Sequence, residues 1–479
     1  MKPTLLLTQF LICGNLLISQ SIQDSLLLTE EGQFEYSSTF FSYNSLINRN
    51  DSPYVYSAST VLGMLTFDIS DLSQPIPIDT IPTLDFNGHS VSGLYQEGDH
   101  LFVALGGIQS IFIRRPGLAI LDISNPAVPS LIGIWDTTAF ENGCAIVRVQ
   151  DGYAYLGIMD GGVLILDIAD PDSIRSVGHI LPDPTFPDDL PYAPKARGLE
   201  VRDSLLFVAY DPGGIRAIDI SDKRNPIEIG MYLHPGLDSI AQPAYNNIRL
   251  AGDYAFATVD YCGLDIIEIS DPTDMHSVYW YNPWTCNGGS WFGSPGHSNE
   301  LILTNHDSLL FMSGGDIELL VMEVSTPAAP VLLAEYGAVE DSAVSWGLDV
   351  WRDKIVLSLV DNSFLWTPIL QPYYGDQGGI RTLSWERMTV PLSGASWSEQ
   401  ELKMFPNPAS DFLHIQFPED WKNYSEVEIR RVSGATMVRT RSNRAARSMS
   451  IETNKWAAGL YIATIRHESG VFTRKFLKR

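Results

Sequence analysis

The sequence predicts an all-β protein, a seven-bladed β-propeller followed by a small C-terminal β-sandwich. Three observations support this prediction: a strand pattern that recurs about every 50 residues, no stretch with the apolar period of a helix, and a change in composition after Pro391. Repeats of this length pack against one another because a single unit cannot bury both of its apolar faces.

The chain begins with a segment typical of a cleaved secretory signal. Lys2 precedes an apolar run over residues 5–18, and small residues follow it. The run is too short and too interrupted to cross a bilayer, so we expect residues 1–21 to be a signal peptide and expect no membrane span. Cysteines of the exported chain can then form disulfides.

The recurring pattern is a short apolar run, an acidic residue, an apolar residue and a small residue before a turn. Six copies occur, at 65–70, 119–124, 164–169, 216–221, 265–270 and 320–325. An alternating aromatic and aliphatic strand is found seven times, at 54–56, 101–103, 154–156, 206–208, 255–257, 310–312 and 355–357. Another strand precedes each of these, and a fourth follows each acidic copy. Four antiparallel strands in each of seven units predict a seven-bladed propeller over residues 22–390.

The acidic residue of the repeat invites a metal or catalytic role, but a structural role explains it better. It stands where a strand enters a turn, and a carboxylate there accepts hydrogen bonds from backbone N–H groups that the turn leaves unpaired. We therefore expect replacement of Asp122 or Asp167 by Ala to lower stability and to leave ligand binding unchanged.

The ring must also be closed between its first and last units. In the seventh unit the corresponding segment, 364–368, has no acidic residue. Residues 34–41, ahead of the first inner strand, are the leading candidate to complete the seventh blade, and residues 382–385 are the alternative.

The repeat resembles the LVIVD family, in which a Gly-rich hairpin leads into a Leu-Val-Ile-Val-Asp-like strand and then a Ser/Asn-Pro turn. Residues 160–168 and 116–126 match this pattern well, and the resemblance extends over about residues 42–385. The resemblance implies a propeller fold.

Propeller connectivity places the turns between second and third strands on the same face as the links between blades. The long links and one enlarged hairpin fall on this loop-rich face, at 181–197, 234–246, 282–299 and 105–116. Loop growth costs little stability and often carries function, so we expect the loop-rich face to bind the ligand.

The first residues of the innermost strands should converge at the mouth of the central channel on this face. With the aromatic residues of the long links, they give these candidate ligand-binding residues: His89, Arg197, Asn246, Trp284, Trp291, His297 and Trp346. Exposed aromatic rings suit stacking against sugars, and they also suit filling gaps between blades, which is the commoner role.

The sequence contains no Gly-rich phosphate loop, no Ser elbow, no His-Glu-x-x-His motif and no Cys-x-x-Cys motif. We therefore expect no catalytic residues, no metal and no cofactor, and a protein that binds a glycan, a peptide or a surface partner. The alternative is an extracellular hydrolase or lyase with its site near His89, Arg197 and His297, since a propeller can assemble a site from separate blades.

The net charge of −26 is unevenly distributed. Residues 401–479 hold 14 Lys and Arg against 8 Asp and Glu, or +6, which leaves −32 for residues 1–400. The acidic part would repel nucleic acid and anionic membranes, so we expect neither as a partner.

Two cysteines of one unit are expected to form a disulfide. Cys262 falls in a hairpin and Cys286 in the following blade link, both on the loop-rich face. The bond would restrain the Trp-bearing link, and Cys144 would remain free.

A second unit follows a linker over residues 391–400. Period-two alternation over several short strands in residues 401–479 predicts a β-sandwich. This unit resembles the C-terminal sorting domain of the type IX (Por) secretion system of Bacteroidetes. The matching residues are Pro406, Asn407, Pro408, Gly459, Tyr461 and Lys475. The resemblance implies that the type IX machinery is a partner, that the domain is removed after export, and that the propeller is secreted or held on the outer cell surface.

Overall fold

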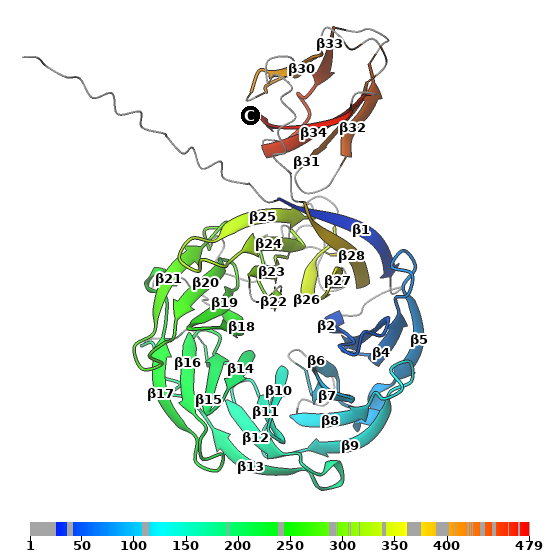
Figure 1. Cartoon of the computed structure of the whole chain (residues 1–479). Coiled ribbons are helices and arrows are strands. Elements are labelled where there is room, and N and C mark those ends of the chain that lie inside the picture. Colours follow the sequence, from blue (N-terminus) through cyan, green and yellow to red (C-terminus); the bar gives the residue numbers. More distant parts are fainter. Residues whose placement is uncertain are drawn as a thin grey trace, which may run out of the picture.

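The computed structural model describes residues 25–35, 42–107, 115–237, 244–286, 294–337, 342–361, 375–388 and 402–478, with shorter gaps inside some of these ranges. The described residues between 25 and 388 form seven sheets, each of four antiparallel strands. Figure 1 shows these sheets as blades arranged in a ring around a central channel, as the sequence predicts.

Each of blades one to three is a meander whose strands run outward from the channel in chain order. Blade one contains β2 (Ser42–Ile47), β3 (Tyr54–Ser59), β4 (Gly63–Asp68) and β5 (Ile76–Ile81). Blade two contains β6 (Val91–Glu97), β7 (His100–Leu105), β8 (Gly117–Asp122) and β9 (Ser130–Asp136). Blade three contains β10 (Ile146–Gln150), β11 (Tyr153–Gly157), β12 (Val163–Asp167) and β13 (Arg175–Ile180).

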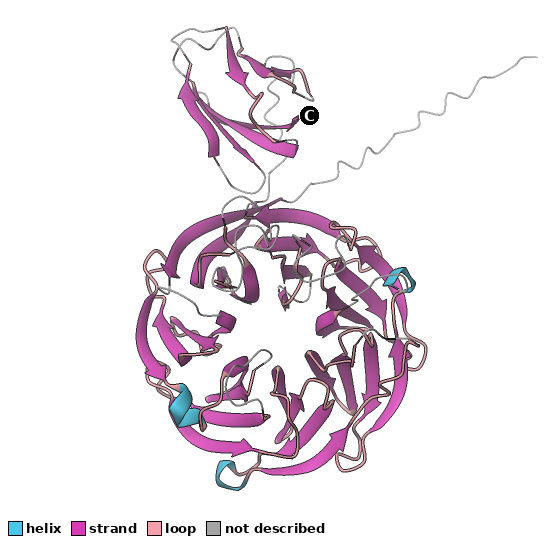
Figure 2. Ribbon diagram, turned by 180° about the vertical axis from the view of Figure 1, so that it is seen from behind, coloured by secondary structure: helices cyan, strands magenta, loops and turns pink. Residues whose placement is uncertain are grey.

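Blades four to six repeat the arrangement. Blade four contains β14 (Gly198–Arg202), β15 (Leu205–Ala209), β16 (Ile215–Asp219) and β17 (Ile227–Tyr232). Blade five contains β18 (Tyr245–Ala251), β19 (Tyr254–Val259), β20 (Gly263–Glu268) and β21 (His276–Tyr281). Blade six contains β22 (Leu301–Thr304), β23 (Leu309–Ser313), β24 (Leu319–Glu323) and β25 (Val331–Tyr336). Short 3-10 helices lie in two blade links, η1 (Thr83–Phe86) and η3 (Pro235–Leu237), and in the turn between β12 and β13, η2 (Pro171–Ser173) (Figure 2).

Blade seven joins the two ends of the propeller. Its strands are β26 (Ser345–Trp351), β27 (Lys354–Leu359), β28 (Gly379–Met388) and, outermost, β1 (Ser25–Glu35). β1 pairs antiparallel with β28 from Ser25 opposite Met388 to Glu35 opposite Gly379. Outside the pairing itself, the Tyr336 hydroxyl of blade six donates to Glu30 of β1 at 2.5 Å.

The closing strand therefore begins earlier than the sequence predicts. Of residues 34–41 only the first two belong to β1, and residues 36–41 lie outside the described residues. The alternative segment, 382–385, lies in β28, which is the third strand of the blade rather than its closing strand. Residues 364–368, assigned from the sequence as the counterpart of the acidic strand, lie outside the described residues, and β28 takes that place in the sheet.

Apolar clusters between neighbouring blades form the core. One contains Ile47, Val55 and Phe67 of blade one with Val356 and Ile380 of blade seven, and it seals the junction at which the chain ends meet. Neighbouring blades cover both faces of the inner part of each sheet, which explains why the second strands are mainly apolar.

The acidic residue of the repeat fastens a turn, as predicted. One carboxylate oxygen of Asp122 accepts a hydrogen bond from the Ser124 backbone N–H at 2.8 Å, and Asp219 accepts one from Ser221 at 2.8 Å. In blade six the corresponding Glu323 forms an ion pair with Arg387 of β28. The hydrogen bonds from Ser124 hold the pKa of the Asp122 carboxyl below its usual range.

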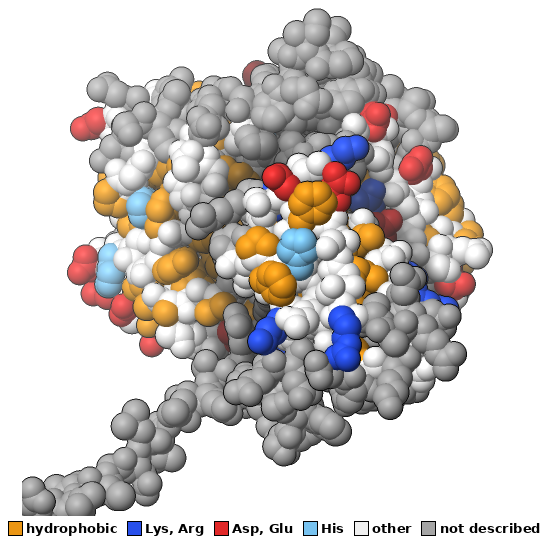
Figure 3. Space-filling model, turned by 90° about the horizontal axis from the view of Figure 1, so that it is seen from above, with side chains coloured by type: hydrophobic (Ala, Val, Ile, Leu, Met, Phe, Trp, Pro, Cys, Tyr) orange, Lys and Arg blue, Asp and Glu red, His pale blue; other side chains and the backbone are white. Residues whose placement is uncertain are grey.

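The C-terminal unit has two sheets. One contains β29 (Lys403–Phe405), β30 (Phe412–Gln416) and β33 (Ser448–Glu452), and the other contains β32 (Thr436–Arg441), β31 (Glu426–Arg431), β34 (Gly459–His467) and β35 (Gly470–Lys478). Leu413 and Ile415 of the first sheet share an apolar cluster with Val427, Ile429 and Tyr461 of the second. In the described part of the face shown in Figure 3, acidic and basic side chains lie scattered among apolar and uncharged ones.

Candidate ligand-binding channel

Two cavities lie along the central channel. The narrower, of about 40 Å³, is lined by residues at the starts of the innermost strands, on the side of the loop-rich face. The wider, of about 290 Å³, is lined by residues from the middle and end of the same strands. Asn44 and Glu300 line both cavities, so the two adjoin.

The narrower cavity brings together three of the residues predicted from the sequence. The Arg197 guanidinium lies over the Trp346 ring, with its Cζ 5.8 Å from the ring centroid. Asn246 is buried beside them, and its side-chain N–H₂ group donates to the Asn299 side-chain oxygen at 2.8 Å and to the Ser298 carbonyl at 3.1 Å. Trp346 is only 7% exposed, so its ring supports Arg197 and is no open stacking platform.

The two predicted histidines do not line either cavity. His89 is fully buried, and its Nε2 lies 3.2 Å from a carboxylate oxygen of Asp136. Burial lowers the pKa of His89. His297 is also fully buried, and its Nδ1 lies 2.9 Å from a carboxylate oxygen of Asp260. Both imidazoles are therefore enclosed by the blades and cannot touch a ligand in the channel.

Trp284, one of the two predicted aromatic residues of the long link, does not form an exposed platform. Trp284 is partly buried against the apolar cluster between blades five and six. Its ring lies directly against the backbone of Gly296, where an added Cβ would come within 1.9 Å of it. Trp284 thus fills a gap between blades, which is the alternative that the sequence leaves open. Trp291 lies outside the described residues.

Cys262 and Cys286 form a disulfide, with their Cα atoms 4.2 Å apart. Cys144 is free and fully buried, and its thiol donates to the Ile146 carbonyl at 3.1 Å. Burial raises the pKa of the Cys144 thiol to about 12, so it stays protonated and is unsuited to act as a nucleophile.

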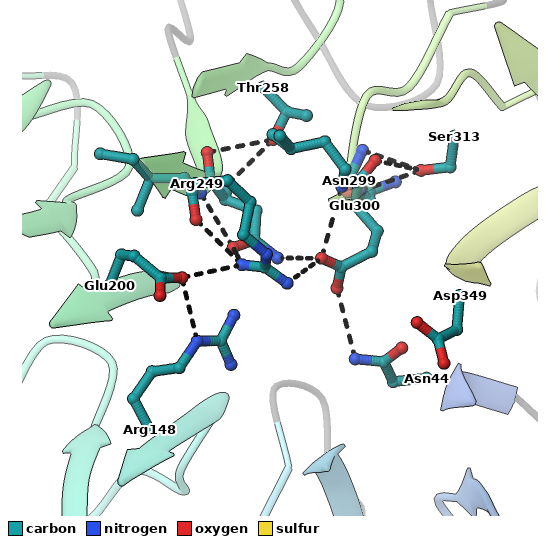
Figure 4. A network of polar contacts seen from close by, with 12 residues as sticks. Asn44, Arg148, Glu200, Arg249, Thr258, Asn299, Glu300, Ser313 and Asp349 are labelled. Atoms are coloured by element: carbon teal, nitrogen blue, oxygen red, sulfur yellow. Dashed lines mark hydrogen bonds and ion pairs between the residues drawn. The ribbon is translucent and has the colours of Figure 1, made fainter. Parts of the chain in front are cut away.

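A cluster of ion pairs in the wider cavity is a feature that the sequence interpretation missed (Figure 4). Arg249 pairs with Glu300 at 2.9 Å and lies 3.5 Å from Glu200. Arg148 contacts the same Glu200 oxygen at 3.3 Å. Asp349, also drawn in Figure 4, pairs with Arg49 at 2.6 Å. Six innermost strands or the residues beside them therefore contribute charge to one polar cavity.

Burial changes the proton affinity of this cluster. It raises the pKa of Glu300, and the neighbouring guanidinium of Arg249 opposes that change. It lowers the pKa of Arg148, and Arg249 adds to the effect by charge repulsion. Paired groups of opposite sign are the usual way in which charges are accommodated inside a protein.

The sequence does contain a signal for the cluster. Charged residues stand alone between two aliphatic residues of an innermost strand, in the triplets 147–149, 199–201, 248–250 and 348–350. Side chains alternate between the two faces of a strand, so the charged residue of such a triplet lies on the opposite face from its two aliphatic neighbours. Its side chain therefore faces the neighbouring blade beside the channel wall.

A buried carboxyl group lies near the narrower cavity. Asp211 is 3% exposed, and the Tyr192 hydroxyl donates to it at 3.3 Å. Burial raises the pKa of Asp211 to about 6, and the nearby positive charges of Arg197 and Lys195 oppose the rise.

The residues of the predicted sorting motif are spread over the C-terminal unit. Pro406 and Asn407 follow β29, and Pro408 lies outside the described residues. Gly459 begins β34, and Tyr461 is fully buried there with its hydroxyl donating to the Ala457 carbonyl at 2.7 Å. Lys475 lies on β35 opposite Ile462 of β34.

Protein-family models match segments of both units. Residues 403–479 match the secretion system C-terminal sorting domain, and residues 111–137, 145–180, 193–234 and 245–282 match the LVIVD repeat. No curated protein sequence shows a significant match.

Solved structures with a similar fold are β-propellers. The RRP9 WD40 repeats share 11% identity with a TM-score of 0.50, over 76% of this chain and 98% of that one. The Cps50 (Swd1) β-propeller domain of Myceliophteria thermophila shares 12% identity with a TM-score of 0.49, over 76% of this chain and 99% of that one. In the part of the chain that the structure describes, no helix is long and apolar enough to cross a membrane.

Proposed function

We propose that this chain, an exported β-propeller with LVIVD repeats and a type IX sorting domain, binds a glycan or peptide chain at the channel mouth on its loop-rich face. The observation that carries the proposal is the arrangement of Arg197, Asn246 and Trp346 around one polar cavity. The sorting domain supplies the route of export, and the loop-rich face supplies the surface for recognition.

The mouth offers both kinds of hydrogen-bonding group. Arg197 is half-buried and is held over Trp346, so its guanidinium can donate with little loss of side-chain freedom. Among the described residues, the Asn246 side-chain oxygen is a buried acceptor without a hydrogen-bond partner. Sugar hydroxyls and peptide amides each combine donors with acceptors, so both ligand classes match this pair.

The described part of the link that follows blade five is held by two contacts, which favours binding without a large ordering cost. The disulfide between Cys262 and Cys286 ties a hairpin of blade five to the link that follows the blade. Trp284 of the same link packs against Gly296. A pre-ordered binding surface loses less entropy when its ligand binds.

Screening the purified full chain on glycan and peptide arrays tests the proposal. We expect a hit whose affinity falls at least tenfold in Arg197→Gln, because a charge-assisted hydrogen bond is lost. Arg202→Gln is the matched control, since Arg202 lies at the far end of β14, the strand that Arg197 immediately precedes. An array without hits, or a hit bound equally by Arg197→Gln, would contradict the proposal.

A further inference from the structure

The wider cavity contains a second group of polar residues, which are not those proposed to bind at the channel mouth. Three guanidinium groups and three carboxylates line it, from Arg49, Arg148, Arg249, Glu200, Glu300 and Asp349. The formal charges of these six groups cancel. Arg197, Asn246 and Trp346 do not line this cavity, so its proposed ligand depends on other residues than the proposed binding at the mouth.

The carboxylates of this cavity already have several donors. Asp349 accepts from Arg49 at 2.6 Å and from the Ile47 backbone N–H at 2.6 Å. Glu300 accepts from Arg249 at 2.9 Å and from the Asn247 side chain at 2.7 Å. These acceptors are therefore occupied by the protein itself.

Arg148 keeps unused donor capacity. Its Nε donates to Glu200 at 3.3 Å and its Nη1 to the Val147 carbonyl at 2.9 Å. Its Nη2 is buried and has no hydrogen-bond partner among the described residues. The side chain is 7% exposed, and an unsatisfied donor at such a site is unfavourable until an acceptor arrives.

We propose that the wider cavity binds a small free carboxylic acid in its ionised form, with a carboxylate oxygen accepting from Nη2 of Arg148. The missing partner is an acceptor, and a charged acceptor forms a hydrogen bond about twice as strong as a neutral one. The Tyr95 ring lies 5.7 Å from the Arg148 guanidinium and holds it from one side.

The rest of the lining suits a short hydrocarbon chain. Leu46, Leu94, Leu250, Ile302, Leu303 and Leu348 line the same cavity. Its volume of about 290 Å³ accommodates an acid of a few carbon atoms. The Arg49 and Glu200 side chains are 28% and 24% exposed, so solvent reaches the cavity.

Calorimetric titration of the full chain with acetate, butyrate and succinate tests this inference, with the corresponding neutral amides as ligand controls. We expect saturable binding of at least one acid and none of its amide. In Arg148→Lys, which keeps the charge but removes Nη2, affinity should fall about tenfold or more. Arg175→Lys is the protein control, because Arg175 is an exposed residue on β13.

The comparison of acid with amide needs no substitution, so it stands even if Arg148→Lys folds poorly. Circular dichroism melting of each variant checks its fold. The inference is overturned if no acid binds saturably, if acid and amide bind alike, or if a folded Arg148→Lys variant binds the acid as tightly as the parent chain.

Discussion

The fully buried guanidinium of Arg216 donates a hydrogen bond from Nη1 to a carboxylate oxygen of Glu228 at 2.8 Å. It also donates to the Gly213 carbonyl at 2.8 Å and to the Phe186 carbonyl at 2.7 Å. The Phe186 and Tyr210 rings lie 5.0 and 5.3 Å from it. Arg216 of β16 thus holds two segments at the loop-rich face, the hairpin that contains Gly213 and the long link that contains Phe186.

Arg216→Met should destabilise the propeller strongly. Removing the guanidinium leaves Glu228 without its ion-pair partner and frees the Phe186 carbonyl, so we expect the free energy of unfolding to fall by about 3–5 kcal/mol. Urea denaturation followed by fluorescence measures the change. The control is Arg175→Met, which breaks an exposed pair with Asp167 and should change stability by less than about 1 kcal/mol. Equal effects of the two substitutions would refute this account of Arg216.

Asp211 should make stability depend on pH. Its folded pKa of about 6 lies above the ordinary aspartate pKa of 3.8, so the folded chain holds a proton that the unfolded chain has already lost between these values. The stabilisation is fully present below pH 3.8 and is lost as pH rises through 6, with an upper limit of about 3 kcal/mol. Asp211→Asn removes this titration.

Melting curves at pH 5, 6 and 7 test the assignment. The parent chain should lose more stability than Asp211→Asn between pH 5 and 7, because only the parent must ionise a buried carboxyl group over that interval. Parallel curves for the two proteins would show that Asp211 does not titrate there.

The repeat made the seven blades predictable, whereas the closing strand depends on long-range pairing. Second strands buried on both faces keep a local apolar pattern, as in Leu206, Phe207 and Val208. β1 pairs instead with a strand about 350 residues away, from Ser25 opposite Met388 to Glu35 opposite Gly379. No local pattern specifies that partner, because the geometry of the closed ring brings the two ends together.

The channel mouth was predictable from connectivity only in part. Arg197, Asn246 and Trp346 lie together because strand starts converge at one end of a propeller channel. His297 also comes from a blade link but is enclosed against Asp260, since a residue's position along the chain does not fix the direction of its side chain. The sequence pattern shows which strands carry the charged residues of the wider cavity. The ion pairs that these residues form depend on the distances across the channel.

The disulfide should contribute substantially to stability. It closes a loop with a sequence separation of 24 residues, which corresponds to about 3 kcal/mol in the chain-entropy model. Reduction of the purified chain, or Cys286→Ser, should lower the urea midpoint accordingly. Thiol titration after denaturation should show neither Cys262 nor Cys286 among the reactive residues, and labelling of either one in the unreduced protein would exclude the bond.

The acidic residue of the repeat should affect stability without affecting binding. Asp122→Ala removes the acceptor of the Ser124 N–H, so the melting temperature should fall slightly. The pKa of Asp122 is below its usual range, so its contribution is present at neutral pH and is lost as the carboxyl protonates in acid. Asp122→Asn, which keeps an acceptor oxygen, should recover part of the loss. Weaker ligand binding in Asp122→Ala with an unchanged melting temperature would contradict the structural role.

Removal of the sorting domain should block export and leave the propeller folded. The apolar cluster of the C-terminal unit runs from Leu402 to Phe476 and shares no residue with the clusters between blades, so truncation at Gly394 exposes no described part of the propeller core. The family match of residues 403–479 assigns the export signal to the part removed. In a bacterium with a type IX system, fractionation followed by limited proteolysis should find the truncated chain in the periplasm and resistant to protease. Its appearance in the medium at the level of the full chain would show that the signal lies elsewhere, and a protease-sensitive periplasmic product would show that the two units depend on each other for folding.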